Sequence, residues 1–131
     1  MEALVLGGSR FIGLHLVRLL SEQGHDVTVL NRGQTPVEFP DGVETLTADR
    51  TNPDQVKAAL EGTSYDVAFD ISGYTPESLA PVVDALEASV GRFVFCSTTL
   101  VYAPSDTAPI VEESSLFRGP NASQYARDKI L

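Results

Sequence analysis

The most constraining feature of the sequence is a glycine-rich turn between a short apolar run and a helical pattern. Residues 3–6 are Ala-Leu-Val-Leu, and Gly7 and Gly8 follow directly. From Phe11 to Gln23 apolar residues recur at helical spacing, and Gly24 ends the pattern. Glycine permits the positive φ that a sharp turn from a strand into a helix requires, and a helix N-terminus presents free N–H groups to an anion. The sequence therefore predicts a strand, a turn and a helix suited to a phosphate-bearing ligand.

Strand and helix signals alternate along the rest of the chain. Further strands are expected over residues 26–30, 43–46, 67–71 and 93–96. Further helices are expected over residues 54–61, from Pro76 to about Val90 with Gly91 as the stop, and from about Asn121. The fifth strand is continuously apolar, as expected when both faces of a parallel strand are covered. The alternation predicts an α/β fold with a Rossmann-type doubly wound parallel sheet, truncated after the fifth strand and its following helix.

Length and composition narrow the class of protein. The chain has 131 residues, the size of one domain or part of one, and its pattern stops within the last expected helix. We therefore interpret residues 1–131 as the N-terminal, nucleotide-binding portion of a longer protein, without a C-terminal substrate-binding part. The single cysteine and the isolated His15 and His25 indicate no metal site. Neither a membrane span nor a secretory signal is expected, so we expect a cytoplasmic protein.

The glycine turn is the first part of an expected dinucleotide site. Its candidate cofactor-binding residues are Gly7, Ser9, Arg10, Phe11, Ile12 and Gly13. The string G-x-G-x-x-G is absent, and Arg10 occupies the position of the middle glycine in the related pattern G-x-x-G-x-x-G. Arg10 either crowds the approach of a pyrophosphate or pairs with a phosphate through its guanidinium. The alternative is a turn that merely opens a helix, with Arg10 in solvent.

The end of the second expected strand indicates which dinucleotide is bound. Asn31 and Arg32 stand where NAD-binding proteins usually carry an acidic residue for the adenosine ribose. A neutral residue beside a cation suits a 2′-phosphate better than a bare ribose, so NADP is favoured over NAD. The alternative is that Asn31, Arg32 and Gly33 only form a turn, for which Asn and Gly are ordinary choices.

Two further strand ends point to the same edge of the sheet. Asp49, followed by Arg50, ends the third expected strand, and its carboxylate can accept a hydrogen bond from an adenine amino group. Ser72 and Gly73 follow the fourth expected strand, where glycine lets the backbone pass close to a cofactor. Asp70, just before them, is interpreted equally well as a functional carboxylate and as a cap of the turn.

A second group of residues has the chemistry of an acid/base centre. Thr98 follows the fifth expected strand, and Tyr125 and Lys129 lie four residues apart, hence on one face of the last expected helix. A free phenol titrates near pH ~10, and a nearby ammonium favours its ionised form. Thr98 can hold a substrate oxygen through its hydroxyl. The alternative is a packed aromatic with an exposed lysine; Tyr74 and Tyr102 likewise either shape a substrate pocket or pack.

These stretches resemble the short-chain dehydrogenase/reductase superfamily, specifically its extended, NAD-dependent epimerase/dehydratase branch. The matching segments are residues 6–13, 48–49, 97–102 and 125–129. The variant Gly-Gly-Ser-Arg-Phe-Ile-Gly, with Asp-Ile-Ser-Gly-Tyr after the fourth expected strand, looks most like the atypical subgroup that includes chloroplast stem-loop-binding proteins. The resemblance implies that residues 1–131 form a NAD(P)-binding Rossmann domain.

The resemblance also implies roles for single residues. Tyr125 would be the catalytic acid/base, Lys129 would orient the nicotinamide ribose and favour the phenolate, and Thr98 would take the family's Ser/Thr role. NADP-using relatives often carry a basic residue in the glycine turn, which favours the phosphate-binding role for Arg10. Asp49 would lie near adenine.

The implied function is epimerase, dehydratase or reductase chemistry with NADP or NAD. The substrate would be a nucleotide sugar or a related carbonyl or hydroxyl compound, and a homodimer is one candidate assembly. The alternative is a non-catalytic dinucleotide-binding or RNA-associated protein of the same fold. The composition disfavours nucleic acid, because 9 Lys and Arg residues stand against 18 Asp and Glu residues, a net charge of -9.

An acidic chain with few lysines is typical of proteins adapted to high salt, because dissolved ions screen its self-repulsion. Lys57 and Lys129 are the only lysines. We therefore expect the free energy of unfolding to fall when salt is lowered from molar to millimolar concentration, as measured by urea titration followed by circular dichroism. Full stability in low-salt buffer would contradict this hypothesis about habitat.

Overall fold

The fold is built on one parallel sheet. The structure, a computed structural model, describes residues 1–106 and 108–130. Leu131, the last residue of the expected domain, lies outside the described residues. The strands are β1 (Glu2–Leu6), β2 (Asp26–Asn31), β3 (Glu44–Thr47), β4 (Tyr65–Asp70) and β5 (Val90–Phe95). All neighbouring strands pair in parallel, in the order β3-β2-β1-β4-β5. The Rossmann-type sheet expected from the sequence is confirmed.

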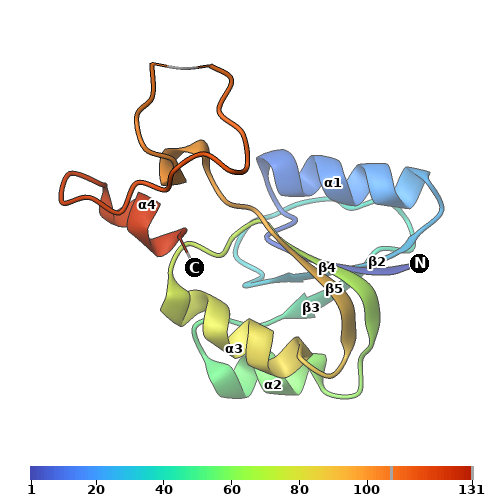
Figure 1. Ribbon diagram of the computed structural model, residues 1–131. Helices are drawn as coiled ribbons and strands as arrows, with labels where there is room; N and C mark the ends of the chain where they lie inside the picture. The colour runs from blue at the N-terminus through green and yellow to red at the C-terminus, as the bar shows by residue number, and fades with distance from the viewer. Residues whose placement is uncertain (107, 131) are drawn as a thin grey trace.

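Helices cover both faces of this sheet (Figure 1). Helix α1 (Phe11–Glu22) lies on one face, whereas α2 (Pro53–Leu60) and α3 (Pro76–Leu86) lie on the other. The short 3-10 helix η1 (Thr99–Val101) and α4 (Gln124–Asp128) lie beyond the carboxyl end of β5. Within the described residues, no helix is long and apolar enough to cross a membrane.

The alternation of side chains along β1 builds two separate hydrophobic cores. Val5 packs with Val17 of α1 on one face, and Leu4 packs with Val82 of α3 on the other. All four side chains are fully buried. Because successive strand residues point to opposite faces, a strand with two covered faces is apolar at every position. Each such side chain contributes about 1.5–3 kcal/mol relative to an exposed one.

The boundary between α3 and β5 differs from the prediction. The helix ends at Leu86 rather than near Val90, and Gly91 lies inside β5 instead of stopping the helix. The turn between them is closed by a bond from the Ser89 amide to the Leu86 carbonyl, 2.9 Å. A Cβ at Gly91 would lie 2.8 Å from the carbonyl oxygen of Asp66, so glycine is needed here for close pairing with β4.

The prediction that both faces of the fifth strand are covered is wrong for the described residues. β5 is an edge strand of the described sheet and pairs with β4; Gly91, Arg92 and Val94 are exposed, and its other residues are half-buried. Val94 keeps 38% of its surface exposed. The last helix also begins later than expected, at Gln124, because the Ser123 hydroxyl caps it by accepting a bond from the Ala126 amide, 3.1 Å.

The glycine turn yields a test of the packing between β1 and α1. A Cβ at Gly13 would lie 2.2 Å from the carbonyl oxygen of Gly7, whereas Gly24, at φ 77°, has no heavy atom within 4 Å of its Cβ position. Gly13→Ala should therefore lower the free energy of unfolding by about 3 kcal/mol or more, and Gly24→Ala by about 1–2 kcal/mol. Urea unfolding measures both, and equal losses would contradict this account of the turn.

Candidate cofactor-binding cleft

A cleft of about 700 Å³ lies at the carboxyl ends of the strands. The predicted residues that line it are Gly7, Ser9, Arg10, Asn31, Arg32, Asp49, Arg50 and Ser72. Lining residues outside the prediction include Gln34, Thr35, Thr51, Tyr74, Thr75 and Ser78. The predicted Phe11, Ile12, Gly13, Gly73, Thr98, Tyr125 and Lys129 do not belong to its lining. The cleft is where ligands bind in open parallel sheets, outside the carboxyl ends of the strands.

The glycine turn packs tightly against the turn after β4 and opens α1 beside the cleft. Gly7 has a φ of 91°, and a Cβ there would lie 2.7 Å from the Cβ of Ser72. Arg10 is the N-cap of α1, and its exposed side chain makes no capping hydrogen bond. The first N–H groups of a helix have no partner within the helix. Those of α1 therefore suit a pyrophosphate. The absence of a side chain at Gly7 lets the glycine turn pack closely against Ser72, which follows β4.

Phe11 and Ile12 contribute to the turn through their backbone. Their side chains are 83% and 65% exposed, and Phe11 adopts a φ of 44°, in the left-handed region that favours glycine. A bulky residue with positive φ is strained unless the surrounding structure fixes it. The strain belongs to the first residue of α1, where the chain leaves the turn.

The end of β2 combines both interpretations made for it. Gly33, at φ 68°, donates its amide to Asn31 Oδ1 at 2.7 Å, which is the expected turn. Asn31 Nδ2 also donates to the hydroxyl of Ser9 at 3.2 Å and so ties this turn to the glycine turn. Asn31 and Arg32 both line the cleft. The turn geometry is therefore compatible with a position of this pair in the cleft lining.

Asp49 presents an ionised carboxylate at the end of β3. Its Oδ1 accepts bonds from the Thr51 amide at 2.9 Å and the Thr51 hydroxyl at 2.7 Å. These bonds, with a smaller contribution from the charge of Arg32, lower the pKa of Asp49. Its own amide donates to Gln55 Oε1 at 2.9 Å. The carboxylate is therefore fixed in place as an acceptor.

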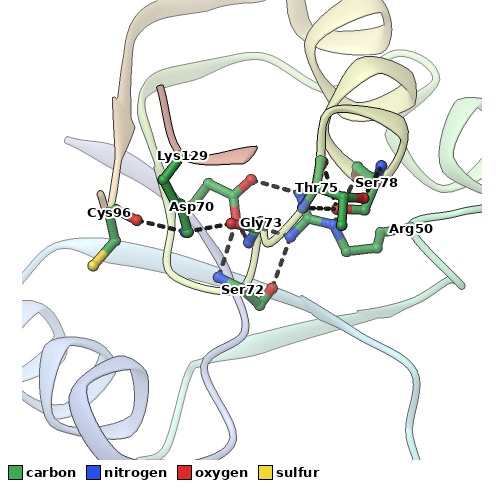
Figure 2. A network of polar contacts seen from close by, with 8 residues as sticks. All are labelled: Arg50, Asp70, Ser72, Gly73, Thr75, Ser78, Cys96 and Lys129. Atoms are coloured by element: carbon green, nitrogen blue, oxygen red, sulfur yellow. Dashed lines mark hydrogen bonds and ion pairs between the residues drawn. The ribbon is translucent and has the colours of Figure 1, made fainter. Parts of the chain in front are cut away.

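Arg50 is bound mainly by protein partners, although its side chain lines the cleft. Its two terminal nitrogens donate to the two carboxylate oxygens of Asp70 at 2.8 and 2.5 Å. It also donates to the hydroxyl of Ser72 at 2.8 Å and, through Nε, to the carbonyl of Ser78 at 2.9 Å (Figure 2). The sequence analysis did not find this pair. The available signal was a carboxylate at the end of a buried strand, which requires a partner of opposite charge.

Asp70 also caps the turn that follows β4, so this alternative for it is confirmed. Its Oδ1 accepts bonds from the amides of Ser72 at 3.0 Å and Gly73 at 2.8 Å. The Asp70 side chain has no exposed surface. Together with the two bonds from Arg50, these contacts satisfy a carboxylate that would otherwise be costly to bury.

The alternative of a packed Tyr125 with an exposed Lys129 is wrong, because the structure shows the opposite. The lysine is buried, with 5% of its surface exposed, and the tyrosine is 39% exposed. Lys129 Nζ donates to the carbonyl oxygens of Gly73 and, at 2.8 Å, Cys96. It lies 4.4 Å from the ring centroid of Phe95 and 5.9 Å from that of Tyr125. Burial lowers the pKa of Lys129, and the negative charge of Asp70 opposes this shift.

Thr98 is the N-cap residue of η1, which fixes the position of its hydroxyl. Its hydroxyl oxygen accepts a bond from the Leu100 amide at 3.3 Å. The neighbouring Ser97 hydroxyl donates to the carbonyl of Lys129 at 3.5 Å. These contacts fasten the end of β5 to the end of α4, so that the segment bearing Thr98 lies beside the Lys129 backbone.

The relatives with similar sequences include a chloroplast protein and a reductase. The chain is 35% identical over 128 residues to the chloroplast stem-loop binding protein of 41 kDa b of Arabidopsis thaliana, with 88% of this chain and 34% of the relative covered. It is 31% identical over 130 residues to 2'-dehydrokanamycin reductase of Streptomyces kanamyceticus, covering 99% of this chain and 36% of that protein. The chain thus spans about a third of the length of these curated relatives.

The chain is similar in fold to a solved epimerase structure, and its sequence matches the model of one protein family. A UDP-glucose 4-epimerase from Bifidobacterium longum, in complex with NAD+ and UDP, superposes with a TM-score of 0.82 at 19% identity, covering 98% of this chain and 46% of the epimerase. The sequence model of the NAD dependent epimerase/dehydratase family matches residues 3–131. With the glycine turn, the parallel sheet and the cleft at its carboxyl edge, this match shows that the chain belongs to the NAD-dependent epimerase/dehydratase family.

Proposed function

We propose that residues 1–131 are the NAD(P)-binding Rossmann portion of an epimerase, dehydratase or reductase acting on a nucleotide sugar or a related carbonyl or hydroxyl compound. The observation that carries the proposal is the glycine turn, where an uncapped helix N-terminus and Gly7 border the cleft. When bound, a nicotinamide dinucleotide supplies hydride transfer. The protein supplies binding, orientation and proton transfer.

Different residues along the cleft bind different parts of the dinucleotide in this proposal. The N-terminal amides of α1 hold the pyrophosphate, and Asp49 accepts a hydrogen bond from the adenine amino group. Ser72 lines the cleft, and Gly73 supports it by letting the chain after β4 pack against Asp70. Arg32, with Arg10 nearby in the lining, provides positive charge for a 2′-phosphate, and the neutral Asn31 adds no repulsion. This arrangement supports a preference for NADP over NAD.

The chemistry is assigned to the partly exposed phenol of Tyr125. In this proposal Tyr125 exchanges a proton with the substrate oxygen, and the hydroxyl of Thr98 holds that oxygen. The ammonium of Lys129, 5.9 Å from the Tyr125 ring centroid, stabilises the phenolate. Its two carbonyl partners, Gly73 and Cys96, keep the ammonium at this place.

The second candidate is a non-catalytic or RNA-associated protein of the same fold. It is supported by the similarity to the chloroplast relative, which is named a stem-loop binding protein. The net charge of -9 argues against it. A gel shift with structured RNA at physiological salt, beside a fluorescence titration with NADPH, separates the two functions. RNA binding without NADPH binding would overturn the leading proposal.

The cofactor preference is tested by removing Arg32. Arg32→Ala should weaken NADPH about tenfold, the effect of losing one charge-assisted hydrogen bond, and leave NADH affinity unchanged. Arg18→Ala is the control, because this exposed arginine lies on α1 outside the cleft lining. Isothermal titration calorimetry measures the affinities. An equal loss for NADPH and NADH would contradict recognition of the 2′-phosphate.

The catalytic assignment is tested by Tyr125→Phe in the full-length protein. Turnover of a panel of nucleotide sugars should fall at least about 100-fold, because proton transfer is lost, whereas NADPH affinity stays within about twofold. Tyr65→Phe is the matched control, since Tyr65 begins β4, at the edge of the sheet opposite the cleft, and does not line the cleft. Unchanged turnover in Tyr125→Phe would remove this residue from the mechanism.

A further inference from the structure

Tyr74 is an exposed aromatic residue on a turn that is otherwise firmly held. It follows Ser72 and Gly73 after β4, and 58% of its surface is exposed. Its side chain lines the cofactor cleft. The sequence left open whether Tyr74 shapes a substrate pocket or packs, and the cofactor-binding roles proposed above do not use it. An exposed aromatic ring in a concave site with polar neighbours is typical of a ligand contact.

The sheet order places Tyr74 at a particular end of the cleft. Arg32 and Asp49 follow β2 and β3, on one side of β1, whereas Tyr74 follows β4 on the other side. The glycine turn after β1 lies between them. If the pyrophosphate lies at that turn and the adenosine end lies by Arg32 and Asp49, the remaining half of the dinucleotide extends toward Tyr74.

Tyr74 also contacts the proposed acid/base centre. Its ring centroid lies 6.4 Å from that of Tyr125, with an angle of 41° between the ring planes. Lys129 Nζ lies 5.3 Å from the Tyr74 ring centroid. Tyr74 therefore connects the dinucleotide cleft with the side chains assigned to proton transfer.

Three side chains hold Ser72 and Gly73, the two residues just before Tyr74 in the chain (Figure 2). Asp70 accepts the amides of Ser72 and Gly73, and Arg50 binds both the Asp70 carboxylate and the Ser72 hydroxyl. From the other side, Lys129 donates to the Gly73 carbonyl. A Cβ at Gly73 would lie 2.7 Å from Asp70 Oδ2, so the backbone is packed directly against the ion pair.

The chain is fixed again immediately after the ring. Thr75 and Ser78 form a capping box at the start of α3, with bonds of 3.2 and 3.3 Å between side chains and amides. Arg50 Nε donates to the Ser78 carbonyl at 2.9 Å. The Arg50 guanidinium therefore binds the Ser72 side chain before Tyr74 and the Ser78 backbone after it. A contact held in place before binding loses little conformational entropy when the ligand arrives.

We propose that Tyr74 is a further binding residue of this site, whose ring contacts the nicotinamide half of the dinucleotide, and that the Arg50–Asp70 ion pair is the positioning element that presents it. This inference rests on the proposed dinucleotide-binding function. A planar aromatic ring suits this ligand half because two flat rings pack favourably in offset or tilted arrangements.

The test compares a whole cofactor with a fragment that lacks nicotinamide. NADPH and 2′-phospho-ADP-ribose are titrated calorimetrically into the 131-residue chain and into Tyr74→Ala, Tyr74→Phe and Val83→Ala. Tyr74→Ala should weaken NADPH about tenfold and leave the fragment unchanged. Tyr74→Phe keeps the ring and should keep the affinity. Val83→Ala, at an exposed apolar position of α3 outside the cleft lining, should change neither.

Fluorescence gives a readout that a loss of stability would not produce. The chain has no tryptophan, so no tryptophan emission excites the bound dinucleotide. At saturating NADPH, the emission of the reduced nicotinamide should shift in Tyr74→Ala relative to the unsubstituted chain, because its neighbouring ring is gone. An unchanged emission together with an unchanged NADPH affinity overturns the contact.

The positioning role is tested by the neutral pair Arg50→Gln/Asp70→Asn. This double variant should lose about as much NADPH affinity as Tyr74→Ala and show no further loss when Tyr74→Ala is added. A folded double variant with unchanged NADPH affinity overturns positioning, and so does one that fails to fold, because the pair then serves stability alone.

The two proposals fail in different ways. If the unsubstituted chain binds neither NADPH nor the fragment, the dinucleotide-binding function fails, and this inference fails with it. If both ligands bind but Tyr74→Ala weakens them equally, the function stands and the assignment of Tyr74 to the nicotinamide half is overturned.

Discussion

The arrangement of the cleft depends on one buried carboxylate. Asp70 ends β4 with no exposed surface, and it is stable there because Arg50 and two backbone amides satisfy its oxygens. Removing one member of such a pair costs about 3–5 kcal/mol, because an uncompensated charge stays buried. The pair joins the ends of β3 and β4 on the side of the sheet covered by α3, where Arg50 also binds the Ser78 carbonyl. The cleft wall is therefore as rigid as the sheet edge that carries it.

Much of the fold follows from local patterns in the sequence. The apolar residues 3–6 of β1, the glycine turn and the alternation of strand and helix signals after it are sufficient to predict a parallel sheet with helices on both faces. The end of α3 was not predictable in the same way, since Leu86 and Val90 both continue an apolar pattern. What decides the boundary is non-local: Val90 pairs with Tyr65 of β4, and Gly91 is pressed against Asp66.

The same distinction between local patterns and non-local contacts applies to the residues of the site. Residues placed by strand ends, such as Asn31 and Asp49, line the cleft as expected from the parallel topology. The partner of Arg50 was missed because Asp70 lies 20 residues away in the sequence, and only the folded sheet brings the two together. Burial of Lys129 was equally hidden, since a lysine near a chain end is normally exposed, and its carbonyl partners come from segments after β4 and β5.

The position of Lys129 determines which side chain reports most directly on the proposed proton transfer. Lys129 closes the network by binding the carbonyls of Gly73 and Cys96, and it also supplies the charge beside Tyr125. A substitution there alters the turn after β4, the anchoring of α4 and the electrostatics of the phenol together. Tyr125 is 39% exposed, so the loss of its hydroxyl leaves the packing intact. Because the lysine serves both structure and charge, the chemistry of this site is best separated from its architecture at the tyrosine.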